Sequence, residues 1–229
     1  MMKRSILILL IAVMVSFSVS AQKKSKAIEM KTPSDSLSYS FGMLIGINMK
    51  TQGVMDVNSE ILLQGFENGY AGVNMALTQE QANKIVQDYF NNLVKGEADS
   101  NLKACKSFLE ENKTKEGVVT LPSGLQYKVL EKGEGTSPLP TDQVKVHYTG
   151  SLINGTVFDS SIERGEPAVF GVNQVIPGWT EALQLMSTGS RWMLYIPPEL
   201  AYGENGAGGV IGPNQALIFE VQLIEINPK

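Results

Sequence analysis

The chain has 229 residues, enough for one large domain or two small ones, and its net charge of −4 argues against a nucleic-acid-binding surface. One His and one Cys are too few for a zinc-type site, and a single Cys excludes an intrachain disulfide. We therefore expect no metal, no cofactor and no nucleic-acid partner.

The first 21 residues have the pattern of a secretory signal peptide. Lys3 and Arg4 precede an apolar run, and Val19-Ser20-Ala21 fits the small-residue cleavage pattern. The run is short for a bilayer span, and an uncleaved anchor or a buried helix is the alternative. We predict export to the periplasm, solubility after cleavage near Ala21, and a flexible leader over residues 22–33. Association with an outer membrane is left open.

Three helices are predicted after the leader. Ser34-Asp35 offers an N-cap to a helix over residues 36–50, and a second periodic pattern covers residues 59–72. The third begins at Thr78, where Gln81 three residues later completes a capping box. Its apolar rhythm resumes after Gly96, which predicts one helix of some 35 residues, about 50 Å long.

A helix of that length exceeds the width of a small domain, and two short helices do not cover its apolar stripe. A second copy of the chain is the economical cover, because closed two-fold dimers are the commonest soluble assembly. We predict a homodimer through residues 34–113, with cover by the chain's own residues as the alternative. Cys105 lies on the apolar register, as expected for a buried small hydrophobe.

Helical periodicity ends at residues 113–117, and alternating strand patterns follow. Among them, Trp179 to Met186 forms one short amphipathic helix, with Leu183, Leu185 and Met186 inward. The fold class is therefore α+β. An all-helical dimerisation domain with a long connecting helix covers residues 34–117, and an antiparallel sheet wrapped on one short helix covers residues 118–229. The strand patterns are Leu125/Tyr127/Val129, Val144/Val146/Tyr148, Trp192/Leu194/Ile196 and Phe219/Val221/Leu223/Ile226.

The motif Val175-Ile176-Pro177-Gly178-Trp179 places a large flat ring at a turn, because Pro-Gly breaks regular structure and Trp179 opens a new helix. Four other motifs that contain aromatic residues flank it, at residues 144–150, 157–161, 200–203 and 217–221. We expect five rings to converge on one apolar hollow that accepts a proline ring. They are Tyr148, Phe158, Trp179, Tyr202 and Phe219.

Familiar catalytic templates fit poorly. His147 with Asp159 and Ser160 suggests a hydrolase triad, but His147 alternates with Val146 and Tyr148 and is expected to face solvent, and no nucleophile elbow is present. The glycine-rich stretch 203–209 lacks the Lys-Ser/Thr of a phosphate loop and is predicted to be a mobile loop near the hollow.

An apolar pocket suits a reaction that needs neither a proton nor a nucleophile. Rotation about an X-Pro amide is such a reaction, since its barrier of about 18–20 kcal/mol comes from C–N double-bond character. The twisted transition state loses much of the amide dipole. It therefore loses less solvation in an apolar cavity than the planar ground state does, which accelerates the rotation.

These motifs resemble the FKBP-type peptidyl-prolyl cis–trans isomerases over residues 121–226, and the helical half resembles the N-terminal module of the macrophage infectivity potentiator (Mip) branch. The resemblance implies a V-shaped homodimer and places the proline pocket on eight residues. Trp179 is the floor, and the Ile176 N–H and Tyr202 hydroxyl are donors. Asp159 is a polar wall group restrained by Arg164. The eight are Tyr148, Phe158, Asp159, Val175, Ile176, Trp179, Tyr202 and Phe219.

The sequence departs from the family pattern at four places. Ala168 stands where a wall aromatic is common, Gln174 replaces a frequent acidic residue, and Ala207 and Gly212-Pro213 alter a loop. These departures bear on the preference for the residue before proline and on macrolide inhibitors as candidate ligands.

Three functional readings follow from the sequence. The first is an isomerase that accelerates folding of exported, proline-containing proteins. The second is a dimeric holdase chaperone whose proline pocket only tethers unfolded chains. The third is a scaffold with a vestigial pocket. The complete ring set favours the first.

Overall fold

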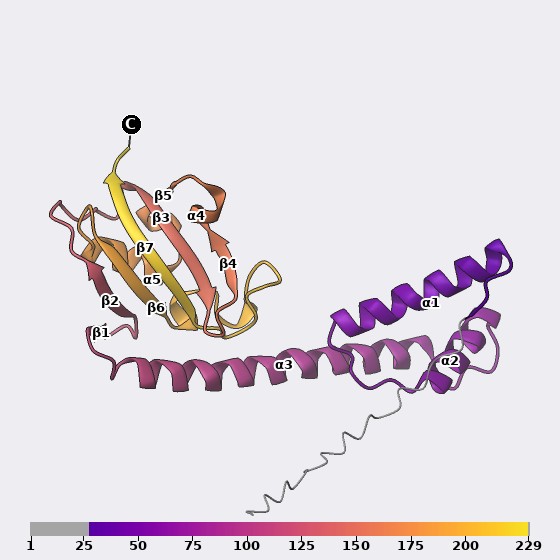
Figure 1. Ribbon diagram of the computed structural model, residues 1–229. Helices are drawn as coiled ribbons and strands as arrows, with labels where there is room; N and C mark the ends of the chain where they lie inside the picture. Colours follow the sequence, from indigo (N-terminus) through magenta and orange to yellow (C-terminus); the bar gives the residue numbers. More distant parts are fainter. Residues whose placement is uncertain (1–27, 229) are drawn as a thin grey trace, which may run out of the picture. The chain divides into compact units, whose positions relative to one another are not determined.

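The computed structural model describes residues 28–228, so the predicted signal peptide and most of the predicted leader lie outside the described residues. The chain divides between Leu62 and Leu63 into two compact units. Figure 1 labels the helices and strands of the chain. None of the helices within residues 28–228 is both long and apolar enough to cross a membrane.

Helix α1 (Pro33–Thr51) begins earlier than predicted. Its N-cap is Thr32 rather than Ser34-Asp35. The Thr32 Oγ1 accepts from the Asp35 N–H at 3.1 Å, and the Asp35 carboxylate accepts from the Thr32 N–H at 2.8 Å. Pro33 then occupies the first helical position, where its missing N–H costs nothing. The expected cap at Ser34 was therefore wrong by two residues.

Helix α2 (Ser59–Ala71) and helix α3 (Gln79–Asn112) match the predicted spans closely. Thr78 caps α3, and the capping box with Gln81 is present as predicted. The helix continues through Gly96 for 34 residues. Only Cys105 and Asn112 of α3 are buried, and both lie in its C-terminal third.

Seven strands follow, and they form one antiparallel sheet in the order β1-β2-β6-β7-β3-β4, with β5 also paired to β3. The central strands β3 and β7 are ten residues each. The α+β class predicted from the sequence is confirmed. The strands are β1 (Val118–Thr120), β2 (Gln126–Glu131), β3 (Gln143–Leu152), β4 (Val157–Ser160), β5 (Ala168–Gly171), β6 (Arg191–Ile196) and β7 (Leu217–Ile226).

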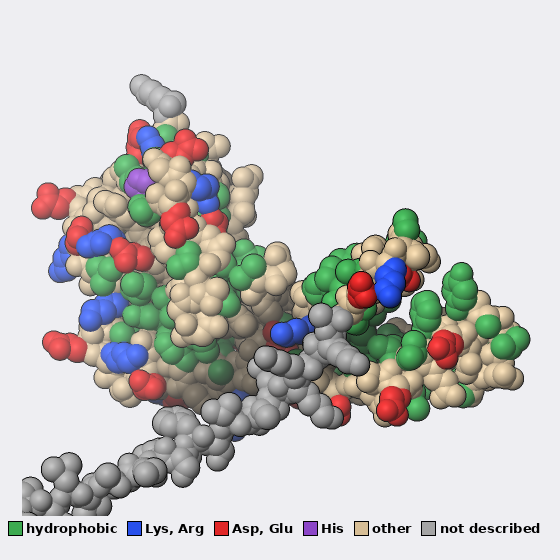
Figure 2. Space-filling view, turned by 45° about the vertical axis from the view of Figure 1, so that its right-hand side comes forward, with side chains coloured by type: hydrophobic (Ala, Val, Ile, Leu, Met, Phe, Trp, Pro, Cys, Tyr) green, Lys and Arg blue, Asp and Glu red, His purple; other side chains and the backbone are tan. Residues whose placement is uncertain are grey.

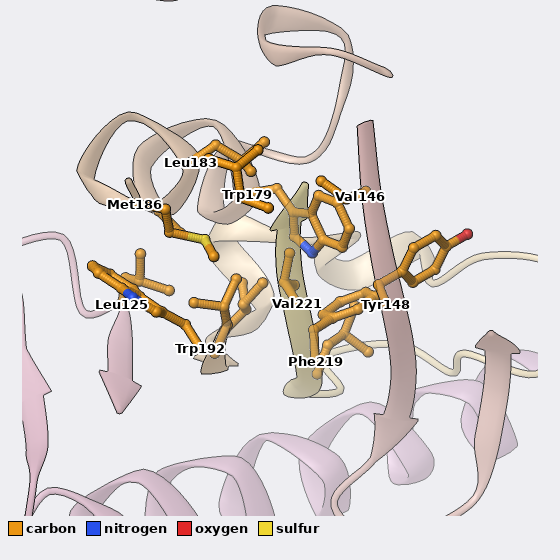
Figure 3. Close-up of a cluster of buried hydrophobic side chains, with 14 of the residues drawn as sticks. Leu125, Val146, Tyr148, Trp179, Leu183, Met186, Trp192, Phe219 and Val221 are labelled. Carbon is orange, nitrogen blue, oxygen red and sulfur yellow. The ribbon is translucent and has the colours of Figure 1, made fainter. Parts of the chain in front are cut away.

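Helix α5 (Pro177–Leu185) packs against the sheet, and the core lies between them (Figure 3). Trp179, Ala182, Leu183 and Met186 are buried, as residues three and four apart share one helix face. Leu185, which was predicted to point inward, is 47% exposed because it falls on the opposite side. The remaining helices are short: α4 (Ser161–Arg164), η1 (Val172–Gln174), η2 (Pro198–Leu200) and η3 (Gly203–Asn205).

The predicted alternation holds on β3, β6 and β7 but fails on β2. There Val129 is 36% exposed, whereas Gln126 is buried. Gln126 is buried because it is hydrogen bonded to α3: its amide donates to the Leu109 carbonyl and accepts from Asn112, both at 2.9 Å. A buried polar side chain is tolerated when its partners are satisfied in this way.

Candidate functional site

A hollow of about 450 Å³ opens beside the N-terminus of α5. All eight residues predicted to form the proline pocket line it, although they come from β3, β4, α5, β7 and two connecting segments. The structure adds three lining residues that the prediction omitted. The full lining is Tyr148, Phe158, Asp159, Phe170, Gln174, Val175, Ile176, Trp179, Tyr202, Ile211 and Phe219.

Trp179 lies at the centre of the aromatic cluster (Figure 3). Its indole ring meets the rings of Tyr148 and Phe219 edge-on, with centroids 5.3 and 5.2 Å away and interplanar angles of 88° and 82°. Such edge-to-face pairs are favourable and leave little freedom to the indole. Trp179 is 4% exposed, yet it borders the hollow, which is the position expected of a floor.

The turn before α5 fixes the direction of Trp179. The Trp179 N–H donates to the Ile176 carbonyl at 2.9 Å, and Pro177 takes the first helical position. The indole Nε1 is buried without a hydrogen-bond partner among the described residues. Figure 3 shows this nitrogen on the side of the indole that faces the sheet, away from any polar group drawn.

Gly150 on β3 brings two further rings together. Phe158 on β4 and Phe219 on β7 meet at 5.5 Å and 84°, one on each side of β3. A Cβ on Gly150 would lie only 2.6 Å from Phe219 Cε1 and 2.7 Å from Phe158 Cζ. The absence of a side chain at Gly150 therefore permits this wall of the hollow.

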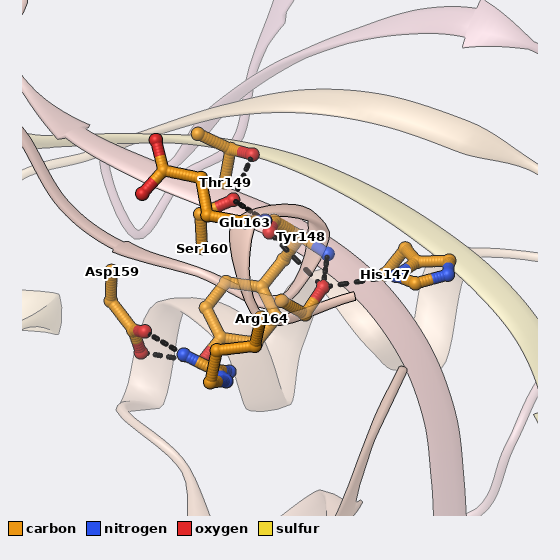
Figure 4. A network of polar contacts seen from close by, with 8 residues as sticks. His147, Tyr148, Thr149, Asp159, Ser160, Glu163 and Arg164 are labelled. Carbon is orange, nitrogen blue, oxygen red and sulfur yellow. Dashed lines mark hydrogen bonds and ion pairs between the residues drawn. The ribbon is translucent and has the colours of Figure 1, made fainter. Parts of the chain in front are cut away.

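Tyr148 and Asp159 form a polar wall of the hollow, and Arg164, which does not line the hollow, is hydrogen bonded to both (Figure 4). The Tyr148 hydroxyl donates to one Asp159 oxygen and Arg164 Nη1 donates to the other. Arg164 Nη2 also donates to the Tyr148 hydroxyl at 2.9 Å, and the guanidinium lies 5.5 Å from the Tyr148 ring centroid. The structure thus shows the expected restraint of Asp159 by Arg164.

These contacts shift two pKa values away from neutrality. Burial alone would raise the pKa of Asp159, but the hydrogen bonds from Tyr148 and Arg164 outweigh it and leave that pKa below its ordinary value. The pKa of Tyr148 is raised, first by burial and then by its hydrogen bond to Asp159. Asp159 is therefore ionised and Tyr148 neutral around pH 7.

The hydrolase template does not assemble. His147 lies on the other face of β3 from Tyr148. Its Nδ1 is 3.1 Å from the Oγ of Ser161, a fully buried residue. Asp159 pairs with Arg164 rather than with His147. Within residues 28–228 there is also no group of three or more His, Cys, Asp or Glu residues arranged to hold a metal ion.

Of the three omitted lining residues, Phe170 is the one that the sequence could have identified. The sequence comparison with the family placed the missing wall aromatic at Ala168, but Phe170 supplies a ring two residues later on the same face of β5. Phe170 contacts Tyr148 and Trp179 with centroids 5.9 Å away in both cases. Strand periodicity through Ala168 and Phe170 was the available signal. Gln174 ends the short helix η1 and Ile211 lies in a loop, and no helical or strand periodicity marks either of them.

Comparison with known proteins places this geometry in a family. Residues 134–224 match the FKBP-type peptidyl-prolyl cis-trans isomerase domain, and residues 34–129 match the domain amino terminal to it. The outer membrane protein MIP of Legionella longbeachae is 46% identical over 213 residues, covering 90% of this chain and 91% of that protein. The chain belongs to the FKBP-type peptidyl-prolyl cis–trans isomerases.

Further relatives agree with this assignment. The FKBP-type 22 kDa peptidyl-prolyl cis-trans isomerase of Escherichia coli is 46% identical, and the match covers 82% of this isomerase and 93% of the relative. The crystal structure of FkpA from Escherichia coli superposes with a TM-score of 0.71 at 33% identity, covering 87% of this chain and 99% of that one. The predicted family and enzyme class are confirmed.

Proposed function

We propose that the hollow lined by Tyr148, Trp179 and Phe219 is the site at which this isomerase rotates X-Pro amides. The observation that carries the proposal is the arrangement of edge-to-face rings around an opening large enough for a proline ring. Trp179 is the floor. Phe158, Phe219 and Tyr148 are walls, Val175 and Ile176 close one rim, and Tyr202 and Asp159 supply polar groups.

The reaction follows from the scarcity of polar groups in the hollow. Twisting the amide breaks its conjugation and lowers its dipole, so the transition state is less costly than the planar amide to hold among aromatic rings. The proline ring stays on Trp179 while the acyl side turns. The Ile176 N–H and the Tyr202 hydroxyl, which is on a residue 40% exposed, hold the pose.

The substrates we propose are proline-containing, unfolded exported proteins. Residues 1–21 act as the signal peptide and residues 22–33 as the leader, which gives a periplasmic location. One similar protein bears the name of an outer membrane protein, and this supports a location in the cell envelope. Macrolides remain candidate inhibitors, because they present a ring to the same hollow.

Residues 34–117 are proposed as the dimerisation domain and residues 118–229 as the isomerase domain. Neither α1 nor α2 buries a single residue in the lone chain, and Phe41, Phe66 and Val86 are 59%, 59% and 55% exposed. Figure 2 shows hydrophobic side chains at the surface of this helical part. Exposure on this scale marks an interaction surface. Sedimentation of the chain from residue 22 as a dimer is expected, and a monomer at all concentrations contradicts the proposal.

The same exposed apolar surface favours a second candidate, a holdase that binds unfolded chains without catalysis. A coupled proline-isomerisation assay on Trp179→Leu and Phe158→Ala separates the two. We expect both variants to lose most of the isomerase rate while still suppressing aggregation of an unfolded protein. If both variants isomerise proline at the parent's rate, the proposed pocket is refuted. If the parent protein shows no isomerisation above background, catalysis itself is refuted.

A further inference from the structure

The loop over residues 201–216 forms the outer rim of the hollow, through Tyr202 and Ile211. It contains only one short helix, η3, and one isolated bridge between Ala207 and Ile211. The two bridge residues exchange backbone hydrogen bonds of 2.8 and 3.0 Å, and the Asn214 N–H donates to the Gly203 carbonyl at 2.8 Å. These bonds close the loop on itself, but they do not fix its position over the hollow.

Helix α3 fixes that position from outside. Asn101 Nδ2 donates to the carbonyl of the buried Pro213 at 2.8 Å, and Asn214 Nδ2 reaches the Ala98 carbonyl at 3.5 Å. The backbone of Gly212 lies against the same stretch of helix, because a Cβ there would overlap Glu97 Oε1 and approach Asn101 Nδ2 at 3.3 Å. Three consecutive loop residues therefore rest on one turn of α3.

This contact lies close to the hollow. Ile211, which precedes Gly212, is 8% exposed and lines the hollow. A shift of the Pro213 carbonyl displaces Ile211, because only Gly212 separates the two residues. The bridge between Ile211 and Ala207 makes the loop tip move together with Ile211. The helix is held to the sheet a second time at Asn112 and Gln126, so α3 is a firm support for the loop.

We infer that Asn101 of α3 is a positioning residue for catalysis, which sets the rim residue Ile211 through Pro213 and so tunes substrate binding and the preference for the residue before proline. The inference rests on the proposed hollow. Because Ile211 borders the hollow and the floor lies on α5, loss of the Asn101 bond changes KM and selectivity and leaves the rotation step nearly intact. One neutral hydrogen bond corresponds to roughly a 2- to 12-fold effect.

The test compares Asn101→Asp with Asn92→Asp in the chain from residue 22. Both changes replace a side-chain amide with a carboxylate on the same helix. At position 101 the carboxylate would repel the Pro213 carbonyl, whereas Asn92 is exposed to solvent. The substrates are Ala-Xaa-Pro-Phe anilides with Leu, Ala or Glu as Xaa. We expect Asn101→Asp to raise KM about 2- to 12-fold, unequally among the three peptides, with kcat within about twofold of the parent. Asn92→Asp is expected to match the parent.

Two further variants keep the outcome decisive. Asn101→Ala removes the donor without adding charge and is expected to change selectivity in the same direction. Gly206→Ala, whose Cβ would overlap the Ile211 carbonyl, displaces the loop from within and is expected to do likewise. The inference is overturned if both Asn101 variants keep the KM and selectivity of the parent protein and differ from it only in a lower unfolding temperature. If Trp179→Leu also keeps parent kinetics, the proposed hollow fails; if it is inactive, only the role of Asn101 fails.

Discussion

Gly150→Ala perturbs two walls of the hollow with a single methyl group. Gly150 lies in the extended strand β3, so alanine is compatible with its backbone and the effect is steric. The new Cβ would lie 2.6 Å from Phe219 Cε1, and ordinary contact begins near 3.4 Å, so a ring or the strand must move by about 0.8 Å. Phe219 is 5% exposed and fixed in the core, and the half-buried Phe158 is the ring that yields.

Overpacking of this kind destabilises a protein by about 1–3 kcal/mol. If the displaced rings weaken binding of the substrate's transition state by the same free energy, kcat/KM falls about 5- to 150-fold. The assay is proline isomerisation of a tetrapeptide, with urea unfolding of the same samples. Gly96→Ala is the matched control, because a Cβ on Gly96 meets nothing within 4 Å. The pocket geometry is refuted if Gly150→Ala is less stable than the parent but its folded fraction keeps the parent's kcat/KM.

Three other predictions concern the polar and buried groups. Asp159 has a folded pKa below its unfolded value, so its contribution to stability is present above about pH 4 and is lost as the pH falls through the folded pKa. Asp159→Asn is expected to be less stable than the parent by about 1 kcal/mol at pH 7, a modest loss because the Asp159 side chain is 42% exposed. In acid unfolding experiments this difference in stability is expected to disappear. Asn112→Ala leaves the buried Gln126 Oε1 without its donor, which costs about 1–3 kcal/mol in urea unfolding, whereas Asn92→Ala is expected to cost far less; equal losses would contradict the role of the pair. Burial raises the pKa of the Cys105 thiol to about 11, so at pH 8 it is expected to react with a thiol reagent only after unfolding, and rapid labelling of the native protein would contradict the packing of α3.

Local signals in the sequence predicted much of this molecule. The capping box at Thr78 and the three-four rhythm that follows predicted α3, and the alternation of apolar residues predicted the central strands. The ordered aromatic motifs predicted which residues line the hollow, because each motif keeps its ring on one side of a strand or turn. These features depend on neighbours within a few residues.

Features that depend on distant partners were not predictable in this way. The burial of Gln126 follows from its bonds to Asn112 and Leu109 on α3, which lie 14 and 17 residues away in the chain. Ile211 reaches the hollow through a loop that has no periodicity. The N-cap of α1 was placed two residues late, because the helix begins with Pro33 and its cap is therefore Thr32.

In the proposed mechanism, burial of the amide among aromatic rings, rather than proton transfer, lowers its rotational barrier. The pH profile of kcat/KM, measured together with its solvent deuterium isotope effect, tests this most directly. Asp159 titrates below and Tyr148 above the neutral range, and His147 lies on the other face of β3. A rotation without proton transfer is expected to give a flat profile between about pH 5.5 and 9 and an isotope effect near one. A bell-shaped profile or an isotope effect of about two or more would contradict it.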